Sequence, residues 1–328
     1  MFDIFNPQVS VVAKGLEGKT IMIYGGNNLG KTKQATRMKK PFYLPFEKGI
    51  NAISGVPFAP INSWADFKML NKQLTGLATV AQAKEKYSTI IFDEVDASAN
   101  YCQRYICGQY GAETIASGKE GFGLWKEYEK EYWEEINKLV GAGYTVVFIA
   151  HKVEDKNGFV LPKGDKRALS PVVDNCDIVV YVQSNGIDSE NKVIKSSGFL
   201  AQTDAFFARS RFDYIDTKLV EFTAENLETA IIEAIERQEK AEGIKAVSYQ
   251  EQKTTFESEK FDYDKLMEDI GAIGEKFINA NKANELVAIV EKHLGKGKKV
   301  SECTNTQVEI MAVIKNDLVD KAKELKLK

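Results

Sequence analysis

The chain has 328 residues, of which 44% are hydrophobic and 28% are charged, values of an ordinary globular protein rather than a disordered, collagen-like or fibrous one. Its formal net charge is −3, so any contact with nucleic acid must depend on a local basic patch. No apolar run approaches the length of about 18 residues that a membrane span needs, and no signal-peptide pattern begins the chain, so we expect a cytoplasmic protein without a membrane partner.

Short, almost wholly apolar runs alternate with amphipathic helical stretches over the first part of the chain. This alternation is typical of an α/β fold, in which helices cover both faces of a mostly parallel sheet. The last strand is expected to pair in an antiparallel hairpin with residues 192–200, through a turn at Ser184-Asn185-Gly186. The predicted strands are residues 20–24, 41–45, 89–92, 145–149 and 178–182.

The domain organisation follows from a change of pattern after residue 242. A helix beginning at Thr223, with a threonine N-cap and an acidic first turn, is expected to close an α/β core over residues 1–242. Residues 243–260 are polar and lack an apolar period, which indicates a linker. Residues 261–328 show apolar positions at three- and four-residue spacing, which predicts a small α-helical C-terminal domain.

The octet GGNNLGKT directly follows the first predicted strand and precedes a helix-forming stretch. It fits the pattern G-x-x-x-x-G-K-[ST], in which backbone N–H groups surround the phosphates of a nucleoside triphosphate. The lysine of this pattern contacts the β- and γ-phosphates, and the hydroxyl residue binds Mg²⁺. The expected nucleotide-binding residues are Gly25, Gly26, Asn27, Asn28, Leu29, Gly30, Lys31 and Thr32.

Carboxylates follow two further predicted strands. A metal beside the P-loop needs a carboxylate opposite Thr32, and Asp93 is the expected ligand, although strand-end aspartates also cap helices. Hydrolysis further needs a group that activates or orients the attacking water. Two residues compete for that role, Glu94 beside the metal aspartate and Glu47 at the end of the second strand.

In their order, these elements resemble the RecA/RadA core, and more closely the phage-encoded nucleotide-binding ATPases of that class, several of which act as single-strand-annealing recombinases. The resemblance covers roughly residues 15–225 and implies a RecA-like P-loop NTPase fold that uses ATP and Mg²⁺. It rests on Gly25–Thr32, Phe46-Glu47-Lys48-Gly49, Ile91-Phe92-Asp93-Glu94, Gly121-Phe-Gly-Leu-Trp125, residues 143–152 and Asp177-Ile-Val-Val-Tyr181.

The resemblance also implies roles for single residues. In RecA-like enzymes the catalytic glutamate ends the strand after the P-loop, which matches Glu47 and ranks it ahead of Glu94. His151 matches the polar γ-phosphate sensor, usually a glutamine, although a lone histidine after a strand is otherwise more often structural. Arg209 and Arg211 match basic fingers offered to a neighbour's nucleotide, which implies a homo-oligomeric ring or filament. Two alternatives to the finger role remain for Arg209 and Arg211: both are exposed surface arginines, or one of them contacts the nucleotide of its own subunit.

RecA-like proteins place DNA-binding loops after the metal strand and after the sensor strand, so that ATP can order them. The corresponding segments here are residues 97–122 and 152–170. Basic residues with interleaved aromatic rings suit single-stranded DNA, but a solvated hairpin would have a similar composition. The expected DNA-binding residues are Arg104, Lys152, Lys156, Phe159, Lys163, Lys166 and Arg167.

These observations predict an ATP-hydrolysing RecA-like phage protein that acts on single-stranded DNA in recombination, annealing or replication. In the C-terminal domain, Lys296, Lys298 and Lys299 would bind DNA or a single-strand DNA-binding protein, or serve as solvated surface groups. The rival interpretation is a nucleotide-dependent switch for another replication or packaging protein, without direct DNA contact. A small-molecule kinase is a third possibility.

Overall fold

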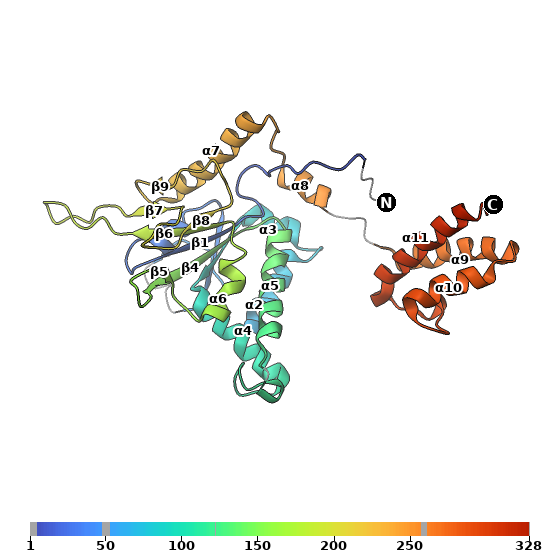
Figure 1. Ribbon diagram of the computed structural model, residues 1–328. Helices are drawn as coiled ribbons and strands as arrows, with labels where there is room; N and C mark the ends of the chain where they lie inside the picture. The colour runs from blue at the N-terminus through green and yellow to red at the C-terminus, as the bar shows by residue number, and fades with distance from the viewer. Residues whose placement is uncertain (1–4, 48–52, 122, 257–260, 328) are drawn as a thin grey trace. The chain divides into compact units, whose positions relative to one another are not determined.

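A computed structural model of the chain describes residues 5–47, 53–121, 123–256 and 261–327. The chain divides into two compact units, Met1–Thr254 and Thr255–Lys328. The first unit is a sheet covered by helices, and the second consists of helices (Figure 1). In the described part of the chain, no helix is both long enough and apolar enough to cross a bilayer.

The sheet has a parallel centre, in the spatial order β2-β3-β4-β1-β6. All five predicted strands are confirmed, and four of them run further at their carboxyl ends than expected. Because β4 lies between β1 and β3, the ends of these three strands stand next to one another. The strands are β1 (Thr20–Gly25), β2 (Pro41–Pro45), β3 (Thr89–Asp93), β4 (Thr145–Glu154) and β6 (Ile178–Gln183).

Antiparallel strands extend this sheet: β5 (Val160–Pro162), β7 (Ser197–Phe199), β8 (Arg209–Ser210) and β9 (Lys218–Leu219). The predicted hairpin after β6 forms, but β6 and β7 pair over three residues only. Beyond them the connection continues to a single bridge between Ile187 and Val193, so the chain reverses after Ile187 and not at Ser184-Asn185-Gly186. This long connection projects from the sheet (Figure 1).

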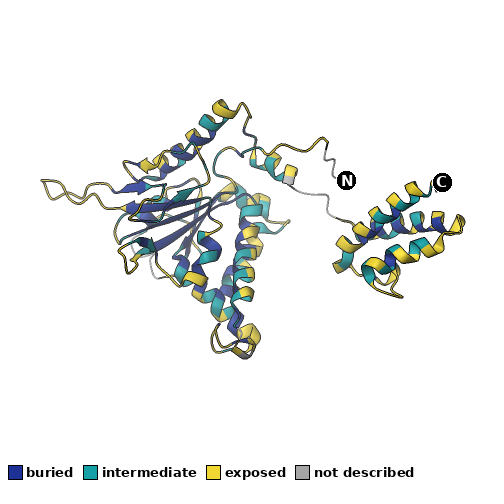
Figure 2. Ribbon diagram, in the orientation of Figure 1, coloured by how far each residue is buried: buried dark blue, intermediate teal, exposed yellow. Residues whose placement is uncertain are grey.

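Helices cover both faces of the sheet because successive residues of each strand point to opposite faces. Met22 and Tyr24 pack on the face covered by α2, α4, α5 and α6, whereas Ile21 and Ile23 pack on the face of α1 and α7. Figure 2 shows the strands buried between these layers. The helices are α1 (Lys31–Ala35), α2 (Trp64–Thr75), α3 (Val80–Lys86), α4 (Val95–Tyr110), α5 (Trp125–Gly141), α6 (Lys166–Val173) and α7 (Ala224–Glu242).

Much of the two segments expected to be loops has regular secondary structure, although residues 111–118 after α4 do not. Residues 97–110 belong to α4, because Val95, Cys102 and Ile106 lie on one face of a helix and are buried in the core. Residues 152–162 form the hairpin of β4 with β5, and α6 then begins after the N-cap Asp165. Of the first segment, Phe122 lies outside the described residues. The effect of ATP on these segments stays a prediction.

The segment expected as a linker contains helix α8 (Tyr249–Phe256). The Tyr249 hydroxyl donates to the Val140 carbonyl at 2.6 Å, and Val247 forms a parallel bridge with Ala13. Tyr249 and Val247 thus attach a segment, otherwise polar in composition, to the first unit. The first compact unit thus extends to Thr254, while residues 257–260 lie outside the described part.

The second unit contains α9 (Tyr263–Asn279), α10 (Ala283–Leu294) and α11 (Val308–Glu324). A short turn joins α9 to α10, whereas residues 295–307, with 3-10 helices at Val300–Glu302 and Asn305–Gln307, join α10 to α11. Asp262 caps α9 through its side chain, and both Gly295 and Gly297 have a positive φ in the turn after α10. The helices enclose their own apolar core, which includes Leu266, Ile270, Phe277, Met311, Ile314 and Leu318. The unit therefore has the core that a separate domain needs.

Lys19 is a buried cation at the start of β1, and we expect it to make stability depend on pH. Its Nζ donates to the Ala13 carbonyl at 2.9 Å. Burial lowers the pKa of Lys19 to about 8, although Asp177 and Glu17 oppose this shift. Between pH 8 and its unperturbed value of 10.5, the unfolded chain binds more protons than the folded one, so the free energy of unfolding rises with pH.

We expect Lys19→Met to increase the free energy of unfolding at pH 7 by about 1–3 kcal/mol, and this gain to shrink toward pH 10. Urea unfolding of both proteins at the two pH values measures the difference. Lys14→Met is the control, because Lys14 is exposed on the same segment. An equal effect of Lys19→Met at both pH values would contradict the prediction.

Candidate nucleotide site

The P-loop connects β1 to α1 at the carboxyl ends of the parallel strands. Gly30, the N-cap of α1, has φ 82°, a conformation that glycine adopts without steric cost. Gly25 approaches β6 so closely that a Cβ there would lie 2.3 Å from the Val182 carbonyl oxygen. Both positions therefore require glycine, and the loop curves tightly at the end of β1.

The Lys31 side chain is buried within this curve. Its Nζ donates to the carbonyl oxygens of Gly26 at 2.6 Å and Gly25 at 3.2 Å. Burial lowers the pKa of Lys31, while Asp93 and Glu94 oppose the shift. The ammonium group thus donates its hydrogen bonds to neutral carbonyls. A phosphate group could replace them, because a hydrogen bond to a charged acceptor is stronger than one to a neutral acceptor.

Thr32, in the first turn of α1, lies next to Asp93, the last residue of β3. The Thr32 hydroxyl donates to Asp93 Oδ2 at 2.7 Å. A hydroxyl and a carboxylate are oxygen ligands of the kind that Mg²⁺ prefers, and this ion commonly completes its shell with waters and substrate phosphates. Among the described residues, no group of three or more His, Cys, Asp or Glu side chains could hold a metal alone. The pair therefore fits Mg²⁺ bound together with a nucleotide.

Tyr43 is a site residue that sequence reasoning missed. It lies on β2, is 1% exposed, and its hydroxyl donates to the same Asp93 Oδ2 at 3.0 Å. In the sequence it appears as one more aromatic residue of an apolar strand, and nothing there distinguishes it from a core residue. The parallel pairing of β2 with β3 brings the two side chains together.

We expect Tyr43→Phe to raise the Mg²⁺ concentration that half-saturates nucleotide binding by about tenfold, because Asp93 loses a group that orients it. The measurement is a Mg²⁺ titration of the binding of a fluorescent ATP analogue. Tyr144→Phe is the control, because the Tyr144 hydroxyl is also buried but donates to the Leu74 carbonyl. Equal Mg²⁺ midpoints for the two variants would remove Tyr43 from the site.

Glu94 and His151 form a pair beside the metal ligands. In the parallel register His151 lies next to Gly25, and its Nε2 is 3.3 Å from Glu94 Oε2. Burial raises the pKa of Glu94 to about 7, with nearby Glu47 adding to the shift. Burial also lowers the pKa of His151, so its imidazole is neutral at pH 7. Its Nδ1 is buried and has no partner among the described residues.

Glu47 lies just beyond β2 and is exposed. Its backbone N–H donates to the Asp93 carbonyl at 3.3 Å, and its carboxylate is close enough to raise the pKa values of Glu94 and His151. The residues after it in the quoted motif, Lys48 and Gly49, lie outside the described part of the chain. Both candidate glutamates thus share one edge of the sheet with Asp93.

The structure places Arg209 and Arg211 at the opposite edge of the sheet. β8 pairs with the amino end of β6. At a rise of about 3.3 Å per residue, this end lies about 15–20 Å from the carboxyl end of β6, where the P-loop is. Arg209 donates to the carbonyls of Cys176 at 2.6 Å and Asp174 at 2.8 Å, and Arg211 lies 3.5 Å from Asp177 Oδ1. At that separation from the P-loop, we do not expect either arginine to contact a nucleotide in its own subunit. A role as a finger toward a neighbour stays a prediction.

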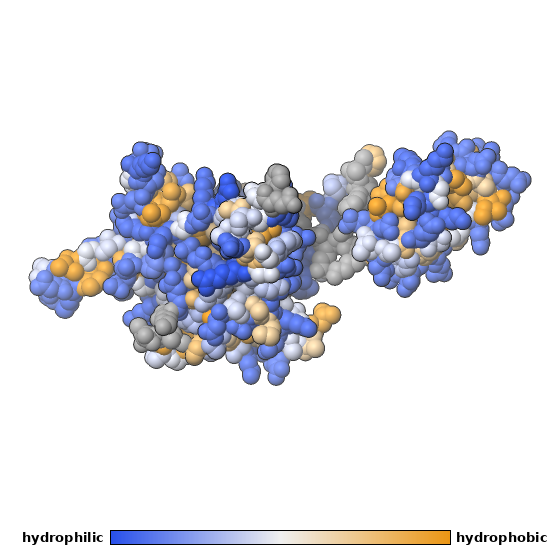
Figure 3. Space-filling view, turned by 90° about the horizontal axis from the view of Figure 1, so that it is seen from below, coloured by the Kyte–Doolittle hydropathy of each residue, from blue (hydrophilic) through white to orange (hydrophobic). Residues whose placement is uncertain are grey.

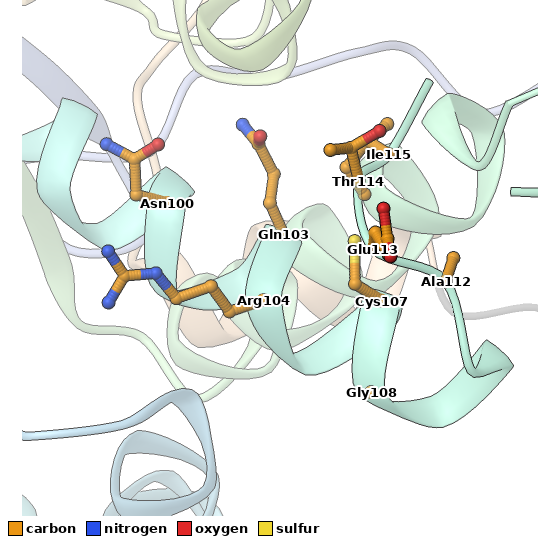
Figure 4. Close-up of a pocket in the computed structure, with 9 residues that line it drawn as sticks. All are labelled: Asn100, Gln103, Arg104, Cys107, Gly108, Ala112, Glu113, Thr114 and Ile115. Carbon is orange, nitrogen blue, oxygen red and sulfur yellow. The ribbon is translucent and has the colours of Figure 1, made fainter. Parts of the chain in front are cut away.

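Arg104 is an exposed residue on α4, and with Asn100 and Gln103 it lines a pocket of about 430 Å³. Figure 4 shows these side chains projecting from α4, with Glu113 and Thr114 on the segment after the helix. The guanidinium lies 6.0 Å from the ring of Tyr101, which in turn packs on Phe46. Tyr101, an aromatic residue of the segment 97–122, therefore packs partly against the core.

The basic residues after β4 have different surroundings. Lys156 is exposed at the turn of the β4–β5 hairpin, and Lys166 is exposed at the start of α6. Lys152 pairs with Glu154 at 2.8 Å, and Arg167 lies over the Trp125 ring at 5.5 Å. Phe159, on the same hairpin, is half-buried.

Lys163 lies close to two residues of the nucleotide site, Glu94 and His151. Its backbone N–H donates to the His151 carbonyl at 2.8 Å, and its charge counteracts the rise in the pKa of Glu94. Lys163 therefore acts electrostatically on Glu94, and its contact with DNA stays a prediction.

Comparison with known proteins agrees with this geometry. A relative from Bacillus subtilis (strain 168), the SPbeta prophage-derived uncharacterized protein YorG, is 67% identical over 318 residues, which are 97% of this chain and 98% of the relative. A family model described as an AAA domain matches residues 17–212, a range that contains the P-loop, Asp93 and His151. The fold is that of a P-loop NTPase, and the chain belongs to the AAA domain family.

Proposed function

We propose that the protein is a RecA-like ATPase that binds and hydrolyses ATP with Mg²⁺. The observation that carries this proposal is the meeting of Lys31, Thr32 and Asp93 at one end of the sheet, with Thr32 Oγ1 and Asp93 Oδ2 2.7 Å apart. Lys31 neutralises charge on the β- and γ-phosphates, and Thr32 with Asp93 holds the metal. Bound Mg²⁺ would neutralise phosphate oxygens as charge develops in the transition state.

Three further side chains act on the water and the γ-phosphate in this proposal. Glu47 orients and deprotonates the attacking water, since its carboxylate is exposed at the open end of the site. His151 contacts the γ-phosphate, and Glu94 positions the imidazole through their 3.3 Å contact. A neutral imidazole can donate one hydrogen bond to a phosphate oxygen as an amide does.

The test is phosphate release from ATP by the purified protein, with Mg²⁺ and with EDTA. We expect multiple turnovers that require Mg²⁺ and that Thr32→Ala reduces strongly, because Thr32 is a proposed ligand of the ion beside Asp93. Ser98→Ala is the control, because the Ser98 hydroxyl is buried between α4 and Tyr132. Tight ATP binding without phosphate release would favour the rival function, a nucleotide-dependent switch for another protein.

We further propose that the ATPase acts on single-stranded DNA in phage recombination, annealing or replication, in the host cytoplasm and as a homo-oligomer. Support comes from the polar pocket beside Arg104 and from the exposed lysines of the β4–β5 hairpin and α6. Both surfaces lie on elements that leave the nucleotide site directly, since α4 follows Glu94 and the hairpin follows His151. A single-strand DNA-binding protein is a further proposed partner.

We expect the triple change Arg104→Ala, Lys156→Ala and Lys166→Ala to weaken oligo(dT) binding by about tenfold or more in ATP, and to flatten its dependence on salt. Fluorescence anisotropy at several salt concentrations measures both effects. The control removes the same charge elsewhere, at exposed Lys14, Lys240 and Lys245. If the two triple variants bind alike, or if binding ignores ATP, these surfaces do not carry the proposed function.

A further inference from the structure

Lys163 follows strand β5 and lies opposite His151 in the pairing of β4 with β5. Lys152 pairs with Pro162, so the next position of this antiparallel ladder places Lys163 across from His151. The Lys163 N–H donates to the His151 carbonyl at 2.8 Å, so the ladder continues to this pair. Side chains of directly opposite residues stand on the same face of a sheet. Lys163 and His151 therefore share one face.

This face is the one that carries the nucleotide site. Ile149, two residues before His151, packs on the side of α1, and alternate residues of a strand point to the same side. In the register of β4 with β1, His151 lies next to Gly25 of the P-loop. Burial lowers the pKa of His151, and the charges of Lys31 and Lys163 lower it further. Both ammonium groups thus lie near the imidazole that the proposed function places at the γ-phosphate.

The backbone around Lys163 is fixed by packing on both sides. Gly164 has φ 149°, and a Cβ there would lie 2.6 Å from Leu169 Cδ1 on α6. At the other edge of β5, the Phe207 N–H donates to the Val160 carbonyl at 2.9 Å. The Lys163 side chain therefore projects from a well-packed position, and only its own rotamers become ordered when a ligand binds.

The Lys163 ammonium group is not bonded to another side chain. Its exposure alone is ordinary, since hydrophilic side chains cover most of the face of the first unit seen in Figure 3. Within the part of the chain that the structure describes, however, it forms no hydrogen bond or ion pair. Burial raises the pKa values of Glu94 and Asp96, and the charge of Lys163 opposes both shifts. An anion that enters beside His151 would therefore meet a nearby cation that is not bonded to a carboxylate.

We propose that Lys163 contacts the γ-phosphate of ATP bound to its own subunit. This inference rests on the proposed nucleotide site, in which Lys31 acts from the P-loop and Lys163 from the end of β5. The γ-phosphate competes with the two nearby carboxylates for the ammonium group, and its greater negative charge favours the phosphate. A cation at this place also offsets the charge that develops on the phosphoryl group during hydrolysis.

The test compares nucleotides with and without a γ-phosphate, by calorimetric titration of the full-length protein with Mg²⁺ and without DNA. We expect Lys163→Met to raise the Kd of the non-hydrolysable analogue AMP-PNP about tenfold, and that of ADP less than about twofold. Lys163→Arg keeps the charge and should restore most of the affinity for AMP-PNP. Lys33→Met is the control, because Lys33 is exposed on α1 just after the P-loop, and it should leave both Kd values within about twofold.

A second background separates a direct contact from an effect through Glu94. Lys163 acts electrostatically on Glu94, so its removal would weaken binding indirectly if Glu94 carried the effect. The Glu94→Gln variant lacks that route, and Lys163→Met added to it should still raise the Kd of AMP-PNP about tenfold. Loss of the effect in this background would overturn the proposal.

Hydrolysis gives a separate readout. Single-turnover hydrolysis without DNA should slow about 10²-fold in Lys163→Met. An unchanged Kd for AMP-PNP in Lys163→Met overturns the contact, even where the wild type hydrolyses ATP as proposed. Conversely, a wild type that binds AMP-PNP through Lys163 but releases no phosphate from ATP supports the contact and contradicts the ATPase alone. The contact is also overturned if Lys163→Met weakens only the binding of oligo(dT).

Discussion

Alanine at Lys31 is expected to lower the turnover of ATP by about a hundredfold or more, and to weaken ATP binding as well. The Lys31 ammonium is buried inside the P-loop, and among the described residues its hydrogen bonds go to the carbonyls of Gly25 and Gly26. Without that cation, the negative charge of the β- and γ-phosphates has no compensating side chain within the loop. Calorimetric titration with ATP and steady-state phosphate release measure the two effects.

Lys33→Ala is the matched control for this change. Lys33 lies on the same short helix α1 but is exposed, so its removal alters charge without altering the inside of the loop. Thermal unfolding should show that both variants are folded. Full activity of Lys31→Ala would show that the octet is a glycine turn without a catalytic function.

Replacing Glu47 with glutamine is expected to reduce turnover by about 10²–10³-fold while ATP affinity stays near that of the wild type. An amide keeps the shape of the side chain but cannot accept the proton of the attacking water. Because the Glu47 carboxylate is exposed and lies beyond the Asp93 carbonyl, the change should leave the P-loop and the metal ligands intact. Single-turnover hydrolysis separates the chemical step from product release.

Glu94→Gln is the comparison that decides between the two carboxylates. The Glu94 side chain is 5% exposed and faces His151, so glutamine at this position should impair positioning and cost less than the change at Glu47. A larger loss in Glu94→Gln than in Glu47→Gln would transfer the role of base to Glu94. Equal losses would indicate that both carboxylates act on the same water.

Much of the fold could be predicted because its signals are local. The five strands are short apolar runs followed by turns, and the N-cap Thr223 with its acidic first turn correctly located the start of α7. The prediction of loops after Asp93 and His151 was wrong for residues 97–110, for the β4–β5 hairpin and for α6. Their glycines and charges dominate the composition, whereas the pairing of β4 with β5 and the burial of one face of α4 are tertiary effects.

By itself, the sequence determined the P-loop and the candidate carboxylates Glu47, Asp93 and Glu94, because a phosphate-binding turn depends on consecutive residues and strand ends follow from apolar runs. Only the tertiary structure decided which side chains meet. The position of β4 between β1 and β3 brings His151 to Glu94, the pairing of β2 with β3 brings Tyr43 to Asp93, and β8 holds Arg209 at the far edge. Such contacts join residues far apart in the chain, so their distances depend on strand order and register, which no local pattern encodes.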